Sequence, residues 1–115
     1  MNRSVKTCRY KYDSIDNIES ILMSIEDELI QEIKPLINAG NLTALEIAWE
    51  DYRDNTDFGR ELAWDYIFQK VYLHAALKKQ RAICEWLDTI FLEFNPMLQI
   101  AMRQMFAYAR YLLHK

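Results

Sequence analysis

The sequence predicts an all-α protein of about five amphipathic helices, packed in a single compact bundle or a short stack of helix pairs. The 115 residues include only two glycines and two prolines, and a β-rich fold of this length would need more of these residues for its turns. Apolar residues recur at steps of three and four along most of the chain, which is the spacing of one face of an α-helix. A chain of this length corresponds to one domain.

The first expected helix starts near Ile15, with Asp13 or Ser14 as its N-cap. Its apolar stripe is formed by Ile15, Ile18, Leu22, Ile25, Leu29 and Ile33. Pro35 is expected to end or kink this helix, because proline has no amide hydrogen to donate. Gly40 follows at a position suited to the left-handed residue that closes a helix.

A second helix is expected to open at Asn41 or Thr43, and Thr43 with Glu46 fits a capping box. Its inward face is expected to consist of Leu45, Ala48, Trp49 and Tyr52. Residues 54–59 (Asp-Asn-Thr-Asp-Phe-Gly) then form a loop, because small polar residues and glycine favour turns.

Residues 60–94 contain neither glycine nor proline, yet their pattern predicts two helices, at 60–78 and 81–93. The polar run 78–81 (Lys-Lys-Gln-Arg) separates two apolar stripes. These are Leu62, Tyr66, Leu73, Ala76 and Leu77 in the first helix, and Ile83, Leu87, Ile90 and Phe94 in the second. Asn95 and Pro96 suit the N-cap and first turn of a last helix. Its seam is Leu98, Met102, Met105, Ala109 and Leu112, broadened by Met97, Ala101, Tyr108 and Tyr111.

Parts of the chain resemble degenerate ankyrin repeats, whose signature begins T-P-L-H-x-A. Residues 43–48 (Thr-Ala-Leu-Glu-Ile-Ala) keep the Thr, the Leu and the closing Ala. Residues 75–87 look like the inner helix, turn and outer helix of such a repeat, and a third copy begins at residue 96. Ankyrin repeats recur about every 33 residues, whereas the alanines of the three copies are 28 and 25 residues apart; they are Ala48, Ala76 and Ala101. The resemblance implies an antiparallel helix-pair stack that binds other proteins.

The net charge of −3 conceals three blocks of opposite sign. Residues 1–12 form a basic N-terminal arm with a charge of +4, and residues 13–115 form the single helical domain. Within that domain, residues 13–65 carry −11 and residues 66–115 carry +4. Such blocks govern association more than fold. The basic parts could lie against the acidic middle, within one chain or across a dimer, or the acidic face could bind a basic protein.

Several aromatic residues of the acidic block stand beside carboxylates, a composition suited to a cationic partner. The residues expected to bind a partner are Trp49, Glu50, Tyr52, Asp54, Trp64 and Asp65. We therefore expect a non-catalytic interaction protein, comparable to an inhibitor or immunity protein. It would form a homodimer or bind a basic partner protein. No catalytic residue, cofactor or metal site is expected, because no pattern in the chain meets the spacing that such sites need.

The chain is expected to be cytoplasmic and to have no contact with membranes. Cys8 and Cys84 are far apart and lack a Cys-x-x-Cys spacing, so both are expected to be reduced. No apolar run approaches the roughly 18 residues of a membrane span, and the N-terminus lacks the apolar stretch of a signal peptide.

Two alternative functions remain open at the level of sequence. The basic C-terminal half could make the protein a nucleic-acid-binding accessory protein through Lys70, Lys78, Lys79, Arg81, Arg103 and Arg110. The acidic net charge argues against this interpretation. A small enzyme could use Cys84 as nucleophile and His74 as base, but only if the fold brings the two side chains within hydrogen-bonding reach.

Overall fold

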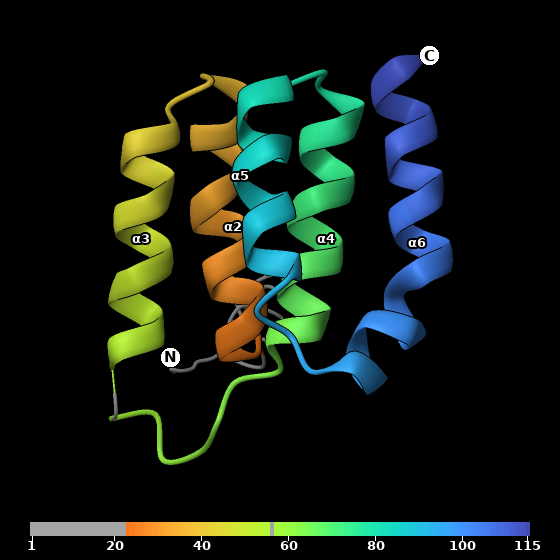
Figure 1. The fold of residues 1–115 in the computed structure, drawn as a ribbon. Coiled ribbons are helices and arrows are strands. Elements are labelled where there is room, and N and C mark those ends of the chain that lie inside the picture. Colours follow the sequence, from red (N-terminus) through yellow and green to blue (C-terminus); the bar gives the residue numbers. More distant parts are fainter. Residues whose placement is uncertain (1–22, 56) are drawn as a thin grey trace, which may run out of the picture.

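The computed structural model describes residues 23–55 and 57–115. Within these ranges the chain forms five α-helices and no strand (Figure 1), which confirms the predicted all-α class. The helices are α2 (Ile25–Asn38), α3 (Leu42–Asp54), α4 (Trp64–Leu77), α5 (Arg81–Phe91) and α6 (Pro96–His114). The predicted basic arm, residues 1–12, lies outside the described residues.

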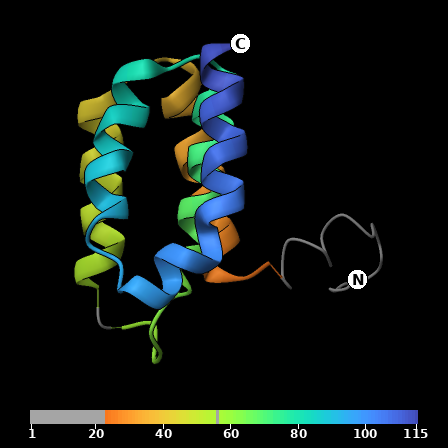
Figure 2. The same ribbon diagram turned by 45° about the vertical axis from the view of Figure 1, so that its right-hand side comes forward.

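The helices are arranged as two helix pairs followed by a single helix. Helix α4 lies between α2 and α6 and packs against both, while α3 packs on α2 and α5 packs on α4. Figure 2 shows the resulting two layers, with α3 and α5 in one layer and α2, α4 and α6 in the other. The α2–α3 and α4–α5 pairs are antiparallel, whereas α6 runs parallel to α4, so that the C-terminal ends of α4 and α6 lie together (Figure 1).

The two helix pairs are closed by turns of the same conformation. Gly40 and Lys79, which lies 39 residues later, both have left-handed backbones, with φ of 68° and 58°. In the first turn the Asn41 amide donates to the Leu36 carbonyl, and in the second the Gln80 amide donates to the Ala75 carbonyl. This six-to-one hydrogen bond defines a Schellman motif, which satisfies the last carbonyls of α2 and α4. The predicted break between the helices at 60–78 and 81–93 is therefore confirmed, with α4 ending at Leu77 and Lys79 in the position that glycine usually occupies.

Several predicted helix boundaries are wrong. Helix α2 begins at Ile25, because the Ser24 hydroxyl caps it by accepting from the Asp27 amide. The expected continuous helix from Ile15 is thus interrupted at Ser24, and its part before Met23 lies outside the described residues. Helix α2 also continues past Pro35 to Asn38.

The other corrections concern α3, α4 and α5. Asn41 caps α3 by accepting from the Ala44 amide, so the capping box expected from Thr43 is not formed. Helix α4 begins at Trp64 rather than residue 60, and α5 ends at Phe91 rather than residue 93.

The core is formed by the faces on which the two layers meet. Its largest fully buried side chains include Trp49, Tyr72 and Phe68. The expected burial of Leu45, Ala48 and Trp49 is confirmed, whereas Tyr66 and Leu77, expected to face inward, are exposed. Helix α4 is covered by α2, α5 and α6, so its buried stripe is wider than one face. Of the predicted stripe only Ala76 is among the buried residues of this helix, which are Ile67, Phe68, Val71, Tyr72, Ala75 and Ala76.

Candidate functional site

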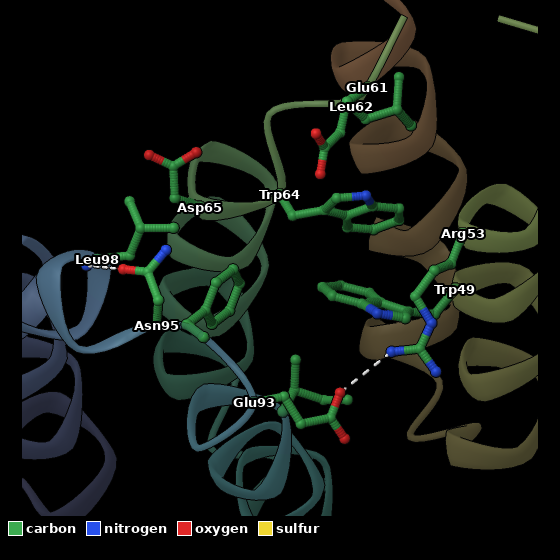
Figure 3. Close-up of a pocket in the computed structure, with 11 residues that line it drawn as sticks. Trp49, Arg53, Glu61, Leu62, Trp64, Asp65, Glu93, Asn95 and Leu98 are labelled. Atoms are coloured by element: carbon green, nitrogen blue, oxygen red, sulfur yellow. Dashed lines mark hydrogen bonds and ion pairs between the residues drawn. The ribbon is translucent and has the colours of Figure 1, made fainter.

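A cleft of about 430 Å³ opens at the end of the molecule that is opposite the two Schellman turns. It is bounded by α3, the connection between α3 and α4, and the turn between α5 and α6 (Figure 3). Its lining consists of Trp49, Arg53, Glu61, Leu62, Trp64, Asp65, Ile90, Glu93, Phe94, Asn95 and Leu98. We call this the acidic cleft.

Two tryptophans in contact with one another form the centre of the apolar part of the acidic cleft. Trp49 is only 1 % exposed, so it serves as the floor, whereas Trp64 is half-buried. Their ring centroids are 5.1 Å apart, and Trp86 packs edge-on against Trp49 at 5.6 Å. Aromatic clusters of this kind are rigid, because each ring is held by its neighbours. Figure 3 shows the indole of Trp64 lying over that of Trp49, so the two rings pack on one another in the wall of the cleft.

The connection that carries one wall of the cleft is fixed by a buried carboxylate on α2. Both oxygens of Glu26 accept from the Arg60 guanidinium at 2.7 Å, and one also accepts from the Ala63 amide at 2.8 Å. Glu26 is 5 % exposed. The hydrogen bonds from Arg60 lower its pKa to about 2, against the opposing effect of burial. This contact holds the chain in an irregular path up to Ala63, and α4 starts directly after it at Trp64.

Carboxylates outnumber cations around the cleft. Glu61, Asp65 and Glu93 line it, and Arg53 is the one basic residue in its lining. Arg53 donates to Glu50 at 2.5 Å and to Glu93 at 3.2 Å, so its charge is already engaged. These carboxylates raise the pKa of Arg53. The cleft therefore combines an apolar aromatic wall with an excess of negative charge, which attracts cations.

The structure brings together three of the six residues predicted to bind a partner. Trp49, Trp64 and Asp65 line the acidic cleft, and Glu50 borders it through its contact with Arg53. The remaining two lie elsewhere. Asp54 is the exposed last residue of α3.

Tyr52 is directed away from the acidic cleft. Its hydroxyl donates to Glu32 on α2, and its ring stacks on Phe58. Burial and the nearby Glu32 carboxylate raise the pKa of Tyr52. Its role in the structure is therefore to join α3 to α2 and to the following connection.

Sequence reasoning did not identify the rest of the cleft. Glu61 and Leu62 were assigned to a helix, and Glu93 and Phe94 to the end of another. The single useful signal was Asn95, whose predicted role as N-cap is confirmed because its side chain accepts from the Leu98 amide. That cap fixes where the chain turns from α5 into α6 beside the cleft.

Cys84 and His74 have different surroundings in the structure. Cys84 is buried, and burial raises the pKa of its thiol to about 11, which keeps it protonated at neutral pH. The His74 ring is hydrogen-bonded to the Asn38 side chain at 2.9 Å. Burial, together with Lys34 and Lys78, lowers the pKa of His74. Neither residue lines the acidic cleft.

The basic residues considered for nucleic-acid binding are distributed over several elements. Lys70 lies over the Tyr66 ring, Lys79 donates to the Leu112 carbonyl, and Arg110 pairs with Asp88 at 3.4 Å. Three of the six candidates are thus engaged within the chain.

The described residues contain no group of three or more histidine, cysteine or acidic side chains placed to hold a metal ion. Among the same residues, no helix is both long enough and apolar enough to cross a bilayer. No protein-family model, curated protein or solved structure matches the chain. The predicted resemblance to ankyrin repeats therefore stays a prediction.

Proposed function

We propose that the protein is a non-catalytic interaction module that binds a basic segment of a partner protein in the acidic cleft. It would act as inhibitors and immunity proteins do, by covering a cationic surface of its target. The observation that carries this proposal is the placement of Glu61, Asp65 and Glu93 around the tryptophan pair.

An arginine or lysine side chain fits this combination of groups. A cation over an indole face gains electrostatic attraction, and tryptophan is the most favourable ring for it. A guanidinium can also donate two parallel hydrogen bonds to a carboxylate, which fixes its orientation. Arg53 shows that the carboxylates at this rim accept a guanidinium, because it bridges Glu50 and Glu93.

Arg53 also sets the strength of the proposed interaction. A guest cation that approaches Glu93 must compete with the guanidinium of Arg53. Removing this charge leaves Glu50 and Glu93 free to bind the guest. Arg53→Gln should therefore tighten binding of a basic peptide, by about threefold to tenfold for a partly exposed charge pair.

The test is a titration of the whole protein with a tri-arginine peptide, followed by tryptophan fluorescence. The matched probe is the same peptide with citrulline in place of arginine, which keeps the shape and removes the charge. We expect the arginine peptide to bind at least about tenfold more tightly, with an affinity that falls as salt is added. Equal binding of the two peptides, or no response to either, would overturn the proposal.

Matched substitutions locate the binding site. Glu61→Gln combined with Glu93→Gln should weaken binding of the arginine peptide by about tenfold. Asp51→Asn is the control for a lost charge, because Asp51 is exposed on α3 and does not line the cleft. If Asp51→Asn weakens binding as much as the double variant, the peptide responds to net charge alone and the cleft is not its site.

A further inference from the structure

Helix α6 has one face that no other described element covers. It stands at one edge of the molecule, with α4 as its neighbour on the inner side (Figure 1). Its buried residues, Met102, Ala109 and Leu113, lie on the inner side. The opposite side carries four large apolar side chains that are more than half exposed: Met97 (77 %), Ile100 (59 %), Tyr108 (56 %) and Tyr111 (61 %).

These side chains belong to a continuous uncharged stripe. Its members recur at steps of three and four, so they share one face of the helix. We define the α6 stripe as Met97, Ile100, Ala101, Gln104, Ala107, Tyr108 and Tyr111, all of which are exposed. In a monomeric helix stack the outer face of the last helix is normally polar. The α6 stripe differs, because Gln104 is its one fully polar side chain in about four turns.

The α6 stripe is symmetric about its central residue. Met97 and Tyr111 lie seven positions on either side of Gln104, Ile100 and Tyr108 lie four, and Ala101 and Ala107 lie three. Two such stripes placed antiparallel would pair each large side chain with a large one and each alanine with an alanine. Gln104 would meet its own copy, and a carboxamide can both donate to and accept from another carboxamide.

We propose that the α6 stripe is the contact between two copies of this chain, related by a twofold axis at Gln104. Such a contact is isologous, because each copy offers the same residues to the other. The four large side chains present on the order of 500 Å². Two stripes together bury about 1,000 Å², which is the lower limit for a specific interface. An interface at this lower limit is typical of weak, reversible association.

The charges beside the stripe give the dimer a distinctive response to salt. Residues 96–115 contain no acidic residue, and Arg103 borders the stripe on one side, together with Arg110, whose pair with Asp88 at 3.4 Å is partly exposed to solvent. A twofold axis across the helices places this side next to the same side of the second copy. Salt screens the repulsion between the arginines, so added salt strengthens the dimer. If the stripe instead bound a different protein whose helix carries acidic flanks, added salt would weaken that binding.

Sedimentation velocity over a range of concentrations tests the association itself. We expect a monomer–dimer equilibrium that shifts toward dimer as salt is raised. Gln104→Glu and Gln104→Lys should each weaken self-association by about tenfold, because each places like charges on the axis. A mixture of the two variants should restore dimer, since opposite charges then meet.

Cysteine cross-linking tests the register, in a chain whose Cys8 is replaced by serine. Gln104→Cys should form a disulfide-linked dimer under mild oxidation, because residue 104 meets its own copy. Met97→Cys is the matched control, since residue 97 lies about 21 Å along the axis from its own copy. Met97→Cys mixed with Tyr111→Cys should cross-link. All three positions are exposed, so these variants should leave the fold intact.

Four results would overturn this inference. They are a monomer at every concentration, a dimer unaffected by substitutions at Gln104, a dimer weakened by salt, and Met97→Cys cross-linking to itself as fast as Gln104→Cys. The proposal is independent of the acidic cleft, because Asp65 and the other cleft residues are outside the α6 stripe. The peptide titration and the sedimentation experiment can therefore fail separately.

Discussion

Glu26→Gln should destabilise the protein in a manner that depends on pH. In the folded chain the hydrogen bonds from Arg60 lower the pKa of Glu26 from 4.5 to about 2. Each pKa unit corresponds to about 1.4 kcal/mol, so the carboxylate contributes about 3 kcal/mol to the free energy of unfolding at neutral pH. The Arg60 side chain is 49 % exposed. Solvent screens the pair accordingly, and we expect a measured loss of about 2 kcal/mol.

The direction of the pH dependence follows from the lowered pKa. Between pH 4.5 and about 2 the unfolded chain binds a proton at Glu26 and the folded chain does not. Stability contributed by Glu26 is therefore complete above pH 4.5 and is lost as the pH falls toward 2. Urea unfolding at a series of pH values should show the wild-type chain and Glu26→Gln converging in stability over that range.

A matched control separates the ion pair from the general effect of charge near a helix start. Glu28→Gln removes the same charge from the first turn of α2, but Glu28 is exposed. It should change stability by less than about 0.5 kcal/mol. The reasoning would be refuted if the difference in free energy of unfolding between wild type and Glu26→Gln stayed constant down to pH 2. A difference as small as that caused by Glu28→Gln would also refute it.

Three further substitutions address the turns and the core. Lys79→Gly should stabilise the chain by about 1 kcal/mol in thermal unfolding, because the left-handed backbone at this position is unfavourable for a residue with a Cβ and glycine has none; a loss of stability would mean that the contact of Lys79 with α6 is worth more than the strain. Gly40→Ala should destabilise by about 1–2 kcal/mol in the same assay, since Gly40 has φ of 68° and a Cβ there would lie 3.2 Å from the Gln80 side chain; a neutral result would show that the turn relaxes. Tyr72→Phe removes a hydroxyl that donates to Asp88 at 2.8 Å, and denaturant unfolding should show a loss of about 1–2 kcal/mol, whereas an unchanged midpoint would mean that Asp88 finds another donor.

The fold was predictable because apolar spacing is a property of each helix by itself. The stripe of α5 and the cap of α6 at Asn95 could be read from neighbouring residues. The start of α4 could not, because it depends on Glu26 pairing with Arg60, 34 positions away. Local propensity favours helix from residue 60, and the tertiary contact overrides it.

The candidate site was predictable only where aromatic and acidic residues are neighbours in sequence. Trp64 and Asp65 were found for that reason, and both line the acidic cleft. Glu93 was missed because it reaches the cleft through the turn into α6, and nothing in residues 92–95 indicates which helix that turn lies beside. Tyr52 lies outside the acidic cleft, since its position along α3 places it on the side of α2.

The two ends of the helix stack differ in how firmly their connections are held. At one end the Schellman turns at Gly40 and Lys79 satisfy the last carbonyls of α2 and α4, and the turns touch through Gln80. The length of each turn is fixed by its six-to-one hydrogen bond. At the other end residues 57–63 follow an irregular path, which Glu26 anchors by accepting from Arg60 and from the Ala63 amide. Binding loops belong on such a connection, because a rigid scaffold can hold it while its residues vary. Loss of the Glu26 contact should therefore lower both the affinity for the tri-arginine peptide and the stability of the fold. Gly40→Ala should lower stability and leave peptide affinity unchanged.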